Sequence, residues 1–301
     1  MNVVPSYHEF IVYLDGQFLP ETQAKLSIFD HAVLYGDAVF DTCCAWAGAV
    51  FKLDAHLDRL YESAKAILLD IPITKADLRS VVLETIRQNQ LREAYVKILV
   101  TRGVGELPIL RPINCRPSVI VFARPYGAAV GSGDKAHGQT AKITATRRIP
   151  AEALDPKIKS CNYLNHVLAY LEAQAAGCDH AIELDLQGAV CEAPGFNVFM
   201  VKRRGLATPA DNILVGITRQ TVCELAVRLG CRVIETRLTA FDLYNADEVF
   251  LSGTAGGIVP IVQIDGRTIG SGETGPITQA IIRAYYALLE SGEQSTPVYG
   301  R

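Results

Sequence analysis

Lys159 is a residue whose type and setting suggest covalent chemistry. It lies within residues 156–165, just before the start of a predicted helix, and Tyr163 follows it by four residues. On a helix, that spacing places both side chains on one face. A lysine amine can form a Schiff base with a carbonyl once desolvation or a nearby cation has lowered its pKa. A lysine beside a helix start is more often a solvated cation, so this assignment depends on the rest of the chain.

Two glycine-containing stretches could bind an anion. Gly216, Ile217 and Thr218 lie at the start of a predicted helix, whose first amides lack internal acceptors and carry the positive end of the dipole. Residues 252–257, Ser-Gly-Thr-Ala-Gly-Gly, lie between two apolar strands and could present backbone amides to a phosphate or carboxylate. An ordinary threonine cap and a plain turn are the alternative interpretations.

Glu192 is a candidate for electrostatic control of a bound ring. It stands between two predicted strands, within residues 190–195, Val-Cys-Glu-Ala-Pro-Gly. A carboxylate there could lie on the surface. If it is instead buried against a pyridine nitrogen, it would keep that ring protonated and able to accept electrons.

The elements that would position these residues mix strands and helices without regular alternation. β-rich runs predict strands, including a hairpin around Asp15-Gly16 and a further pair that begins within residues 32–41. A long loop is expected at residues 102–117, and such loops are often functional. Apolar residues at helical spacing predict helices at residues 54–69 (capped by Asp54), from Thr74 onward, and at 162–176, 218–229 and 277–289. The pattern favours the α+β fold class over a doubly wound sheet.

The length of 301 residues predicts about two domains. Residues 125–138 lose periodicity and gain glycine and proline, which is typical of a linker. We therefore expect a small N-terminal α/β domain at residues 1–124 and a large C-terminal domain at residues 139–301.

Composition excludes several classes of function. The formal net charge is −3 at pH 7, so no basic field is available to bind nucleic acid. The eight cysteines form no C-x-x-C pair and have no histidine at zinc-finger spacing, so we expect reduced thiols and no metal site. There is no signal-peptide pattern and no uninterrupted apolar run of about 18 residues, so we expect a cytoplasmic protein without a membrane span.

Taken in order, these motifs resemble the class IV, or fold type IV, aminotransferases that depend on pyridoxal 5′-phosphate (PLP). The family includes branched-chain amino acid, D-amino acid and (R)-amine aminotransferases, and aminodeoxychorismate lyase. The resemblance covers about residues 11 to 289 and implies a two-domain fold type IV PLP enzyme. It is carried by Tyr35-Gly-Asp-Ala-Val-Phe40, His56-Leu-Asp-Arg59-Leu, Thr101-Arg-Gly103, Lys159-Ser-Cys-Asn-Tyr163-Leu-Asn, Glu192, Gly195-Phe-Asn197, Gly216-Ile-Thr218 and Ser252-Gly-Thr254-Ala255.

The resemblance implies a role for each matching residue. Lys159 would form the Schiff base with PLP and then carry a proton between the substrate and the cofactor, whereas Lys157 does not match the motif. The cofactor would be bound by its phosphate at Arg59, Ile217, Thr218 and Thr254, by its ring hydroxyl at Tyr163, by its ring nitrogen at Glu192 and on its ring face by Leu214. The substrate pocket would be lined by Tyr35, Phe40, Tyr95, Thr254 and Ala255. The loop at Arg102-Gly103 would close that pocket, and the family is at least dimeric, which implies a homodimer or higher homo-oligomer.

The chain departs from the branched-chain pattern at two positions. The usual F-E-G-I-R is Phe40-Asp-Thr-Cys-Cys44 here, and the usual Y-I-R is Tyr95-Val-Lys97. A guanidinium binds a carboxylate through two parallel hydrogen bonds, whereas an ammonium acts as a point charge and a thiol binds hardly at all. The loss of arginine at positions 44 and 97 therefore alters how a substrate carboxylate is recognised. Alternatively, Lys97 or Arg102 binds that carboxylate instead.

Several interpretations of function remain open. The first is transamination between a branched-chain-like L-amino acid and a 2-oxo acid such as 2-oxoglutarate or pyruvate. An (R)-amine or D-amino acid donor is the second, because residues 195–197 and 254–257 resemble the (R)-amine enzymes, as do Asp41 and Trp46. A lyase of the aminodeoxychorismate type and a non-catalytic PLP-binding protein are the remaining alternatives.

Overall fold

The computed structural model describes residues 9–127 and 138–300. The chain divides into two compact units, one formed by Met1–Ala129 with Gln294–Arg301 and the other by Val130–Glu293. The residues from Gln294 onward thus group with the first unit, whereas the predicted large C-terminal domain spans residues 139–301. The expected linker at 125–138 falls largely on residues 128–137, which lie outside the described residues.

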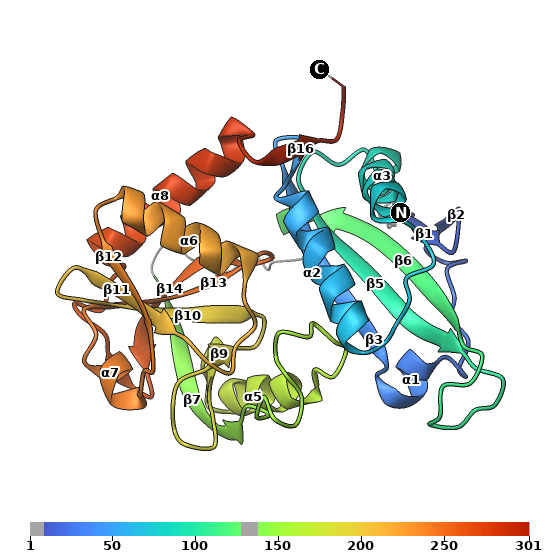
Figure 1. The fold of residues 1–301 in the computed structure, drawn as a ribbon. Coiled ribbons are helices and arrows are strands. Elements are labelled where there is room, and N and C mark those ends of the chain that lie inside the picture. The colour runs from blue at the N-terminus through green and yellow to red at the C-terminus, as the bar shows by residue number, and fades with distance from the viewer. Residues whose placement is uncertain (1–8, 128–137, 301) are drawn as a thin grey trace, which may run out of the picture. The chain divides into compact units, whose positions relative to one another are not determined.

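The first unit is built on an antiparallel sheet that, over the described residues, has seven strands in the order β16-β4-β3-β5-β6-β1-β2 (Figure 1). The strands are β1 Ile11–Leu14, β2 Gln17–Pro20, β3 Ala38–Trp46, β4 Ala49–Phe51, β5 Ala94–Val104, β6 Arg116–Pro125 and β16 Ser295–Pro297. The predicted hairpin around Asp15-Gly16 is confirmed as β1 and β2. The predicted loop at 102–117 is shorter, because β5 continues past a bulge between Thr101 and Val104.

Two helices, α2 (Leu53–Ala66) and α3 (Lys75–Gln88), cover one face of this sheet (Figure 1). Apolar side chains of α2 at helical spacing are buried there, and Thr74 caps α3 as predicted. The prediction that Asp54 caps α2 was wrong. Lys52 occupies the cap position, and Asp54 lies in the first turn, where a carboxylate favours the helix dipole.

The strand expected to begin within residues 32–41 was partly wrong, since the short helix α1 (His31–Tyr35) precedes β3. The Asp30 side chain accepts a hydrogen bond from the Ala32 amide at 2.8 Å and so caps α1. Gly36 ends the helix with a φ of 69°, a left-handed conformation that glycine adopts readily. Capping at both ends has outweighed the β propensity of the residues between them.

The second unit is built on a mixed sheet whose described strands follow the order β12-β11-β10-β13-β14-β7-β8, with β9 paired to β10 and β15 to β14. The pairs β11–β12, β14–β7 and β7–β8 are parallel and the others antiparallel. The strands are β7 Gln139–Arg147, β8 His180–Leu184, β9 Glu192–Ala193, β10 Phe196–Lys202, β11 Gly205–Pro209, β12 Arg232–Thr236, β13 Glu248–Gly253, β14 Gly257–Ile264 and β15 Arg267–Thr268.

The helices of the second unit are α5 Leu164–Ala175, α6 Ile217–Arg228, α7 Ala240–Tyr244 and α8 Pro276–Ser291 (Figure 1). Helix α5 packs against β7 and β8, while α6 and α8 pack against each other and against β13. Ile182, Val198 and Leu251 belong to the buried apolar core of the sheet. The mixture of elements in both units confirms the predicted α+β class.

Candidate active site

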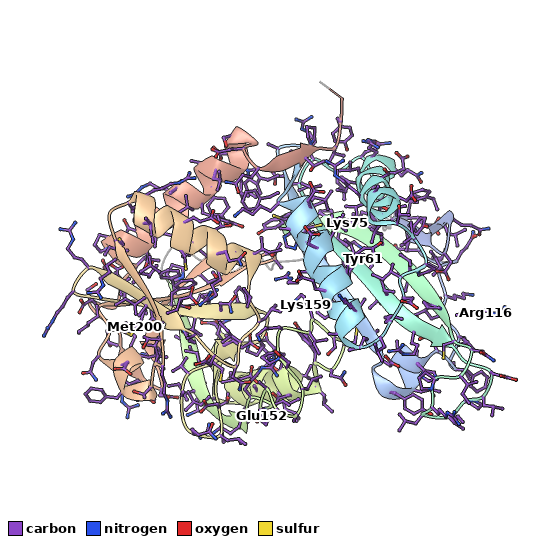
Figure 2. All side chains as sticks on the ribbon, viewed as in Figure 1. Tyr61, Lys75, Arg116, Glu152, Lys159 and Met200 are labelled. Atoms are coloured by element: carbon purple, nitrogen blue, oxygen red, sulfur yellow. The ribbon has the colours of Figure 1, made fainter. Side chains whose placement is uncertain are left out.

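Lys159 is buried, although the segment that carries it is not helical. Its side chain lies in the irregular stretch before α5 (Figure 2), and the residue is 8% exposed. The Nζ donates a hydrogen bond to the Tyr163 hydroxyl at 3.0 Å. The predicted pairing of the two side chains is therefore present, but α5 begins only at Leu164, so a turn rather than a helix face brings them together. Lys157, by contrast, has a side chain that is 69% exposed and pairs with Asp155.

Glu192 is buried, and both of its carboxylate oxygens are held. Arg148, itself buried, donates from Nε to Oε1 at 2.7 Å, and the backbone amide of Leu214 donates to Oε2 at 3.1 Å. Strand β9 carries Glu192 opposite Asn197 of β10. A buried carboxylate requires such partners, because its desolvation is costly unless opposite charge and hydrogen bonds compensate it.

The start of helix α6 is built closely around Asn197. A Cβ atom added to Gly216, the N-cap residue, would lie 2.1 Å from Asn197 Oδ1, so a side chain does not fit there without displacement. Asn197 in turn donates from Nδ2 to the Leu214 carbonyl at 2.8 Å. Ile217 and Thr218 follow and are buried. This arrangement leaves the first amides of α6 and the positive end of its dipole available to an anion. The alternative interpretation, an ordinary threonine cap, was wrong, since Gly216 holds the cap position.

The glycine-rich stretch at 252–257 is a tighter turn than the sequence suggested. Ser252 pairs with Ile258 and Gly253 with Gly257 as part of β13 and β14, so only residues 254–256 connect the strands. An added Cβ on Gly253 would lie 2.6 Å from the Gly195 carbonyl oxygen, and one on Gly256 would lie 2.2 Å from the Phe196 ring. Backbone therefore approaches backbone closely, which brings Thr254 and Ala255 beside the strand that carries Asn197.

These contacts connect most of the predicted cofactor residues within the second unit. The series of contacts begins with Lys159 and Tyr163, whose ring meets the His166 ring edge-on with centroids 4.8 Å apart. His166 Nε2 lies 3.7 Å from Glu192 Oε1. From Glu192 the contacts continue through Leu214 to Asn197 and on to Gly216.

In the first unit, Arg59 is held by a buried carboxylate. Its guanidinium donates from Nε to Asp41 Oδ2 at 2.8 Å and from Nη2 to Oδ1 at 2.9 Å, a bidentate pair. His56 Nδ1 lies 2.7 Å from the same Oδ1. Burial alone would raise the pKa of the Asp41 carboxyl, but the charges of Arg59 and His56 and their hydrogen bonds hold that pKa well below its ordinary value. Asp41 therefore fixes the direction in which Arg59 points.

Four predicted substrate residues share one face of the first sheet. Cys44 pairs with Tyr95, and Phe40 and Lys97 lie on the same face by the alternation of β3 and β5, opposite the face that α2 and α3 cover. The Lys97 Nζ lies 4.1 Å from the centroid of the Phe40 ring, a cation–π contact. Burial raises the pKa of the Cys44 thiol to about 12, so that side chain stays neutral.

Arg102 and Gly103 hold the base of the loop after β5. Arg102 donates to Asp37 Oδ2 at 2.5 Å and to the carbonyls of Ile67 and Leu68 at 2.7 and 2.9 Å. Gly103 has a φ of 78°, and an added Cβ would lie 1.6 Å from the Arg116 carbonyl oxygen. The guanidinium therefore links β5 to the end of α2. These contacts disfavour a role for Arg102 in binding a substrate carboxylate.

The remaining predicted pocket residue in this unit, Tyr35, is 37% exposed at the end of α1, and its hydroxyl lies 3.5 Å from the Pro108 carbonyl. Five buried polar residues, two in the first unit and three in the second, were not given a role from sequence although they contact the predicted site residues or one another. They are Asp41, His56, Arg148, His166 and Glu183. One signal was available: Glu183 interrupts the otherwise apolar run of β8, and a charge inside such a strand is seldom buried without a purpose.

Within the described residues, no helix is long and apolar enough to cross a membrane, and no cluster of three His, Cys, Asp or Glu side chains is arranged to hold a metal ion.

A two-unit α+β chain with a buried lysine and a buried, charge-paired glutamate fits a PLP-dependent enzyme. The family model for class IV amino-transferases matches residues 38–264. A Methanocaldococcus jannaschii protein, provisionally named as a branched-chain-amino-acid aminotransferase, is 47% identical over 273 residues, which are 90% of this chain and 93% of that protein. The chain belongs to the class IV aminotransferases, which are PLP-dependent enzymes.

Solved structures agree with this membership. The branched-chain aminotransferase of Thermoproteus uzoniensis, solved with norvaline, is 36% identical with a TM-score of 0.90 and covers 97% of this chain and 100% of its own. The T.th. branched-chain amino acid aminotransferase, complexed with N-(5′-phosphopyridoxyl)-L-glutamate, is 33% identical with a TM-score of 0.91 and covers 97% and 99%. These similarities confirm the predicted fold type IV architecture.

Proposed function

We propose that the enzyme transfers the amino group of a branched-chain-like L-amino acid to a 2-oxo acid such as 2-oxoglutarate or pyruvate. The relatives and solved structures that resemble it are named for branched-chain substrates. One of those structures was solved with norvaline, another with 4-methylvaleric acid, and a third with a glutamate adduct of the cofactor. An apolar donor and a 2-oxoglutarate acceptor would explain all three ligands.

The residues of the second unit fit PLP by the chemistry of their donor groups. Bound PLP supplies a protonated ring that withdraws electrons from the substrate Cα. Lys159 would hold the cofactor and then accept and return the Cα proton, with Tyr163 orienting the amine through their 3.0 Å hydrogen bond. Glu192 would accept a hydrogen bond from the ring nitrogen, since its carboxylate is buried and its charge is already compensated by Arg148. This buried lysine–tyrosine pair is the observation that carries the proposal.

The remaining cofactor contacts follow from the glycine-built helix start and turn. We propose that Ile217 and Thr218, at the start of α6, and Thr254, in the turn between β13 and β14, bind the phosphate, and that Leu214 packs on the ring face. In the first unit we assign Arg59 to the phosphate as well, because Asp41 fixes its guanidinium in one orientation.

Substrate selection is assigned to the shared sheet face of the first unit. Phe40, Tyr95 and Lys97 would contact the donor and acceptor there. Cys44 would contribute a small side chain that carries no charge. Tyr35, the loop at Arg102-Gly103 and Ala255 would complete the pocket. Lys97, stacked on the Phe40 ring, is the cation we assign to a substrate carboxylate.

An (R)-amine or D-amino acid donor is the second candidate. The observation that favours it is the absence of a guanidinium at positions 44 and 97, where branched-chain enzymes usually carry arginine. An (R)-amine has no carboxylate and loses nothing by that change, whereas a substrate with a carboxylate loses a partner that can form two parallel hydrogen bonds.

We also propose a homodimer or larger homo-oligomer that works in the cytoplasm. Helix α5 exposes Leu164, Leu168 and Leu171 along one face, 70%, 50% and 51% accessible, and an apolar stripe of this kind is typical of an interface. All eight cysteines are free thiols, which suits a reducing compartment.

Half-reactions on the PLP-loaded enzyme test the donor. L-leucine, D-alanine and (R)-1-phenylethylamine are added separately, without acceptor, while the visible absorbance of the bound cofactor is followed. We expect fast bleaching with L-leucine, and slower bleaching by at least about tenfold with the other two. Fast bleaching with D-alanine or the (R)-amine instead would establish the second candidate, and no bleaching with any donor would overturn the proposed function.

A further inference from the structure

A buried histidine connects the second unit's predicted cofactor residues to a carboxylate that the mechanism does not use. His166 lies in the first turn of α5 and is 5% exposed. Its Nδ1 lies 2.5 Å from Glu183 Oε2, and its Nε2 lies 3.7 Å from Glu192 Oε1. The imidazole therefore stands between two carboxylates, with one ring nitrogen directed at each.

His166 is also the side-chain partner of a second buried carboxylate. Glu183, on β8, is fully buried, and its Oε1 has no hydrogen-bond partner among the described residues. Arg148 donates to Glu192, and His166 is the side chain that contacts Glu183. An unpaired carboxylate inside a protein is strongly unfavourable. Arg148 and His166 are thus the side-chain partners of the two glutamates, Arg148 of Glu192 and His166 of Glu183.

The same ring also contacts the residue that holds the catalytic lysine. The rings of Tyr163 and His166 meet edge-on at an interplanar angle of 61°, and Tyr163 accepts the hydrogen bond from Lys159. His166 thus contacts both Tyr163 and Glu192. A movement of its ring would therefore affect Lys159 through Tyr163. It would also affect Glu192, the carboxylate assigned to the ring nitrogen of PLP.

We propose that His166, held by Glu183, is a positioning residue that orients Glu192 and Tyr163 for bound PLP. The inference rests on the proposed role of Glu192 toward the ring nitrogen. At 3.7 Å the contact between Nε2 and Oε1 is electrostatic rather than a hydrogen bond, so His166 acts by placing the polar edge of its ring beside one oxygen of Glu192. Glu183 keeps the imidazole in that orientation through its contact with Nδ1.

The test compares His166→Phe and Glu183→Gln with Glu192→Gln. Phenylalanine keeps a ring against Tyr163 but carries no charge, and glutamine is isosteric with glutamate. PLP binding is measured by titration of the cofactor-free protein, and the visible absorbance of bound PLP is recorded across pH. We expect His166→Phe and Glu183→Gln each to weaken PLP binding about tenfold and to shift the pH at which that absorbance changes.

Two further variants separate positioning from general damage. Adding His166→Phe to Glu192→Gln should weaken PLP binding by clearly less than the product of the two single effects, because part of the effect of His166 passes through Glu192. Glu248 is another buried carboxylate of the same unit, which accepts hydrogen bonds from Ile277, Thr278 and the Thr278 hydroxyl at the start of α8. Glu248→Gln should lower the unfolding temperature and leave the PLP absorbance profile unchanged.

The outcomes distinguish this inference from the proposed function. Wild-type PLP affinity and pH profile in both His166→Phe and Glu183→Gln would overturn the positioning role, as would fully additive effects in the double variant. If Glu192→Gln alone changes neither readout, the assignment of Glu192 fails and the positioning role fails with it, while bleaching by L-leucine still tests the reaction. If His166→Phe does not fold, Glu183→Gln carries the same comparison.

Discussion

Two lysines only two residues apart have opposite surroundings. Lys159 is buried against a tyrosine hydroxyl, while Lys157 extends into solvent. We expect Lys159→Ala to abolish the visible absorbance of bound PLP and to lower turnover about a thousandfold or more, because the amine that we propose to hold the cofactor and move the proton would be lost. Lys157→Ala should stay within about twofold of wild type. Absorbance and steady-state turnover of both variants, measured together, check this; the reverse result would move the catalytic role to Lys157.

Asp41 makes the stability of the first unit depend on pH. Because the pKa of its carboxyl is depressed in the folded state, its stabilisation is fully present above the ordinary aspartate pKa of about 4 and is lost as pH falls toward the folded-state value. Asp41→Asn should cost about 3–5 kcal/mol of unfolding free energy at pH 7, since it leaves Arg59 without its buried partner. Below about pH 4, the difference from wild type should shrink.

Urea denaturation of the cofactor-free protein at several pH values measures this difference. Asp54→Asn is the matched control, because Asp54 forms only an exposed ion pair with Arg79 and should contribute about 1 kcal/mol or less. A gap between wild type and Asp41→Asn that stays constant from pH 7 down to pH 3 would contradict the assignment.

At the scale of elements, the start of α6 depends on a missing side chain. Gly216→Ala places a Cβ against Asn197 Oδ1, and Asn197 cannot easily yield because it is buried and bonded to the Leu214 carbonyl. We expect a loss of about 1–3 kcal/mol in unfolding free energy, as in other overpacked sites, together with weaker PLP binding. Gly205→Ala is the control, since its nearest neighbouring atom would be 3.4 Å away and it lies at the start of β11. Equal behaviour of the two variants in denaturation and PLP titration would refute the steric argument.

Sequence alone could predict the elements with strong local signals and the residues that lie in ordered motifs. Thr74 capped α3 as expected, and Lys159 and Tyr163 met as expected. It could not predict that α1 would replace part of a strand, because two caps outweighed the β propensity between them. Nor could it find Arg148 or His166, since their importance comes from carboxylates brought close by folding rather than from neighbours in the chain.

At the scale of the whole molecule, the proposed oligomer would cover the exposed stripe on α5. Sedimentation velocity of the PLP-loaded enzyme should show a particle of at least twice the chain mass. Leu168→Glu places a charge in the middle of the stripe and should shift the distribution toward smaller species, whereas Val227→Glu, at an exposed position on α6, should not. A monomeric wild type would contradict the proposed oligomer, and an unchanged Leu168→Glu would place the interface elsewhere.

The pairing of β16 with β4 has a consequence for how the protein is made. Ser295 lies opposite Phe51, and the Val298 carbonyl accepts a hydrogen bond from Arg87. A ribosome must therefore synthesise the entire second unit before the edge strand of the first sheet exists. Until then β4 presents unpaired backbone amides and carbonyls to the cell. The nascent first unit is thus incomplete through most of its synthesis, and this exposed edge is where we expect chaperones to act and where premature release from the ribosome would favour aggregation.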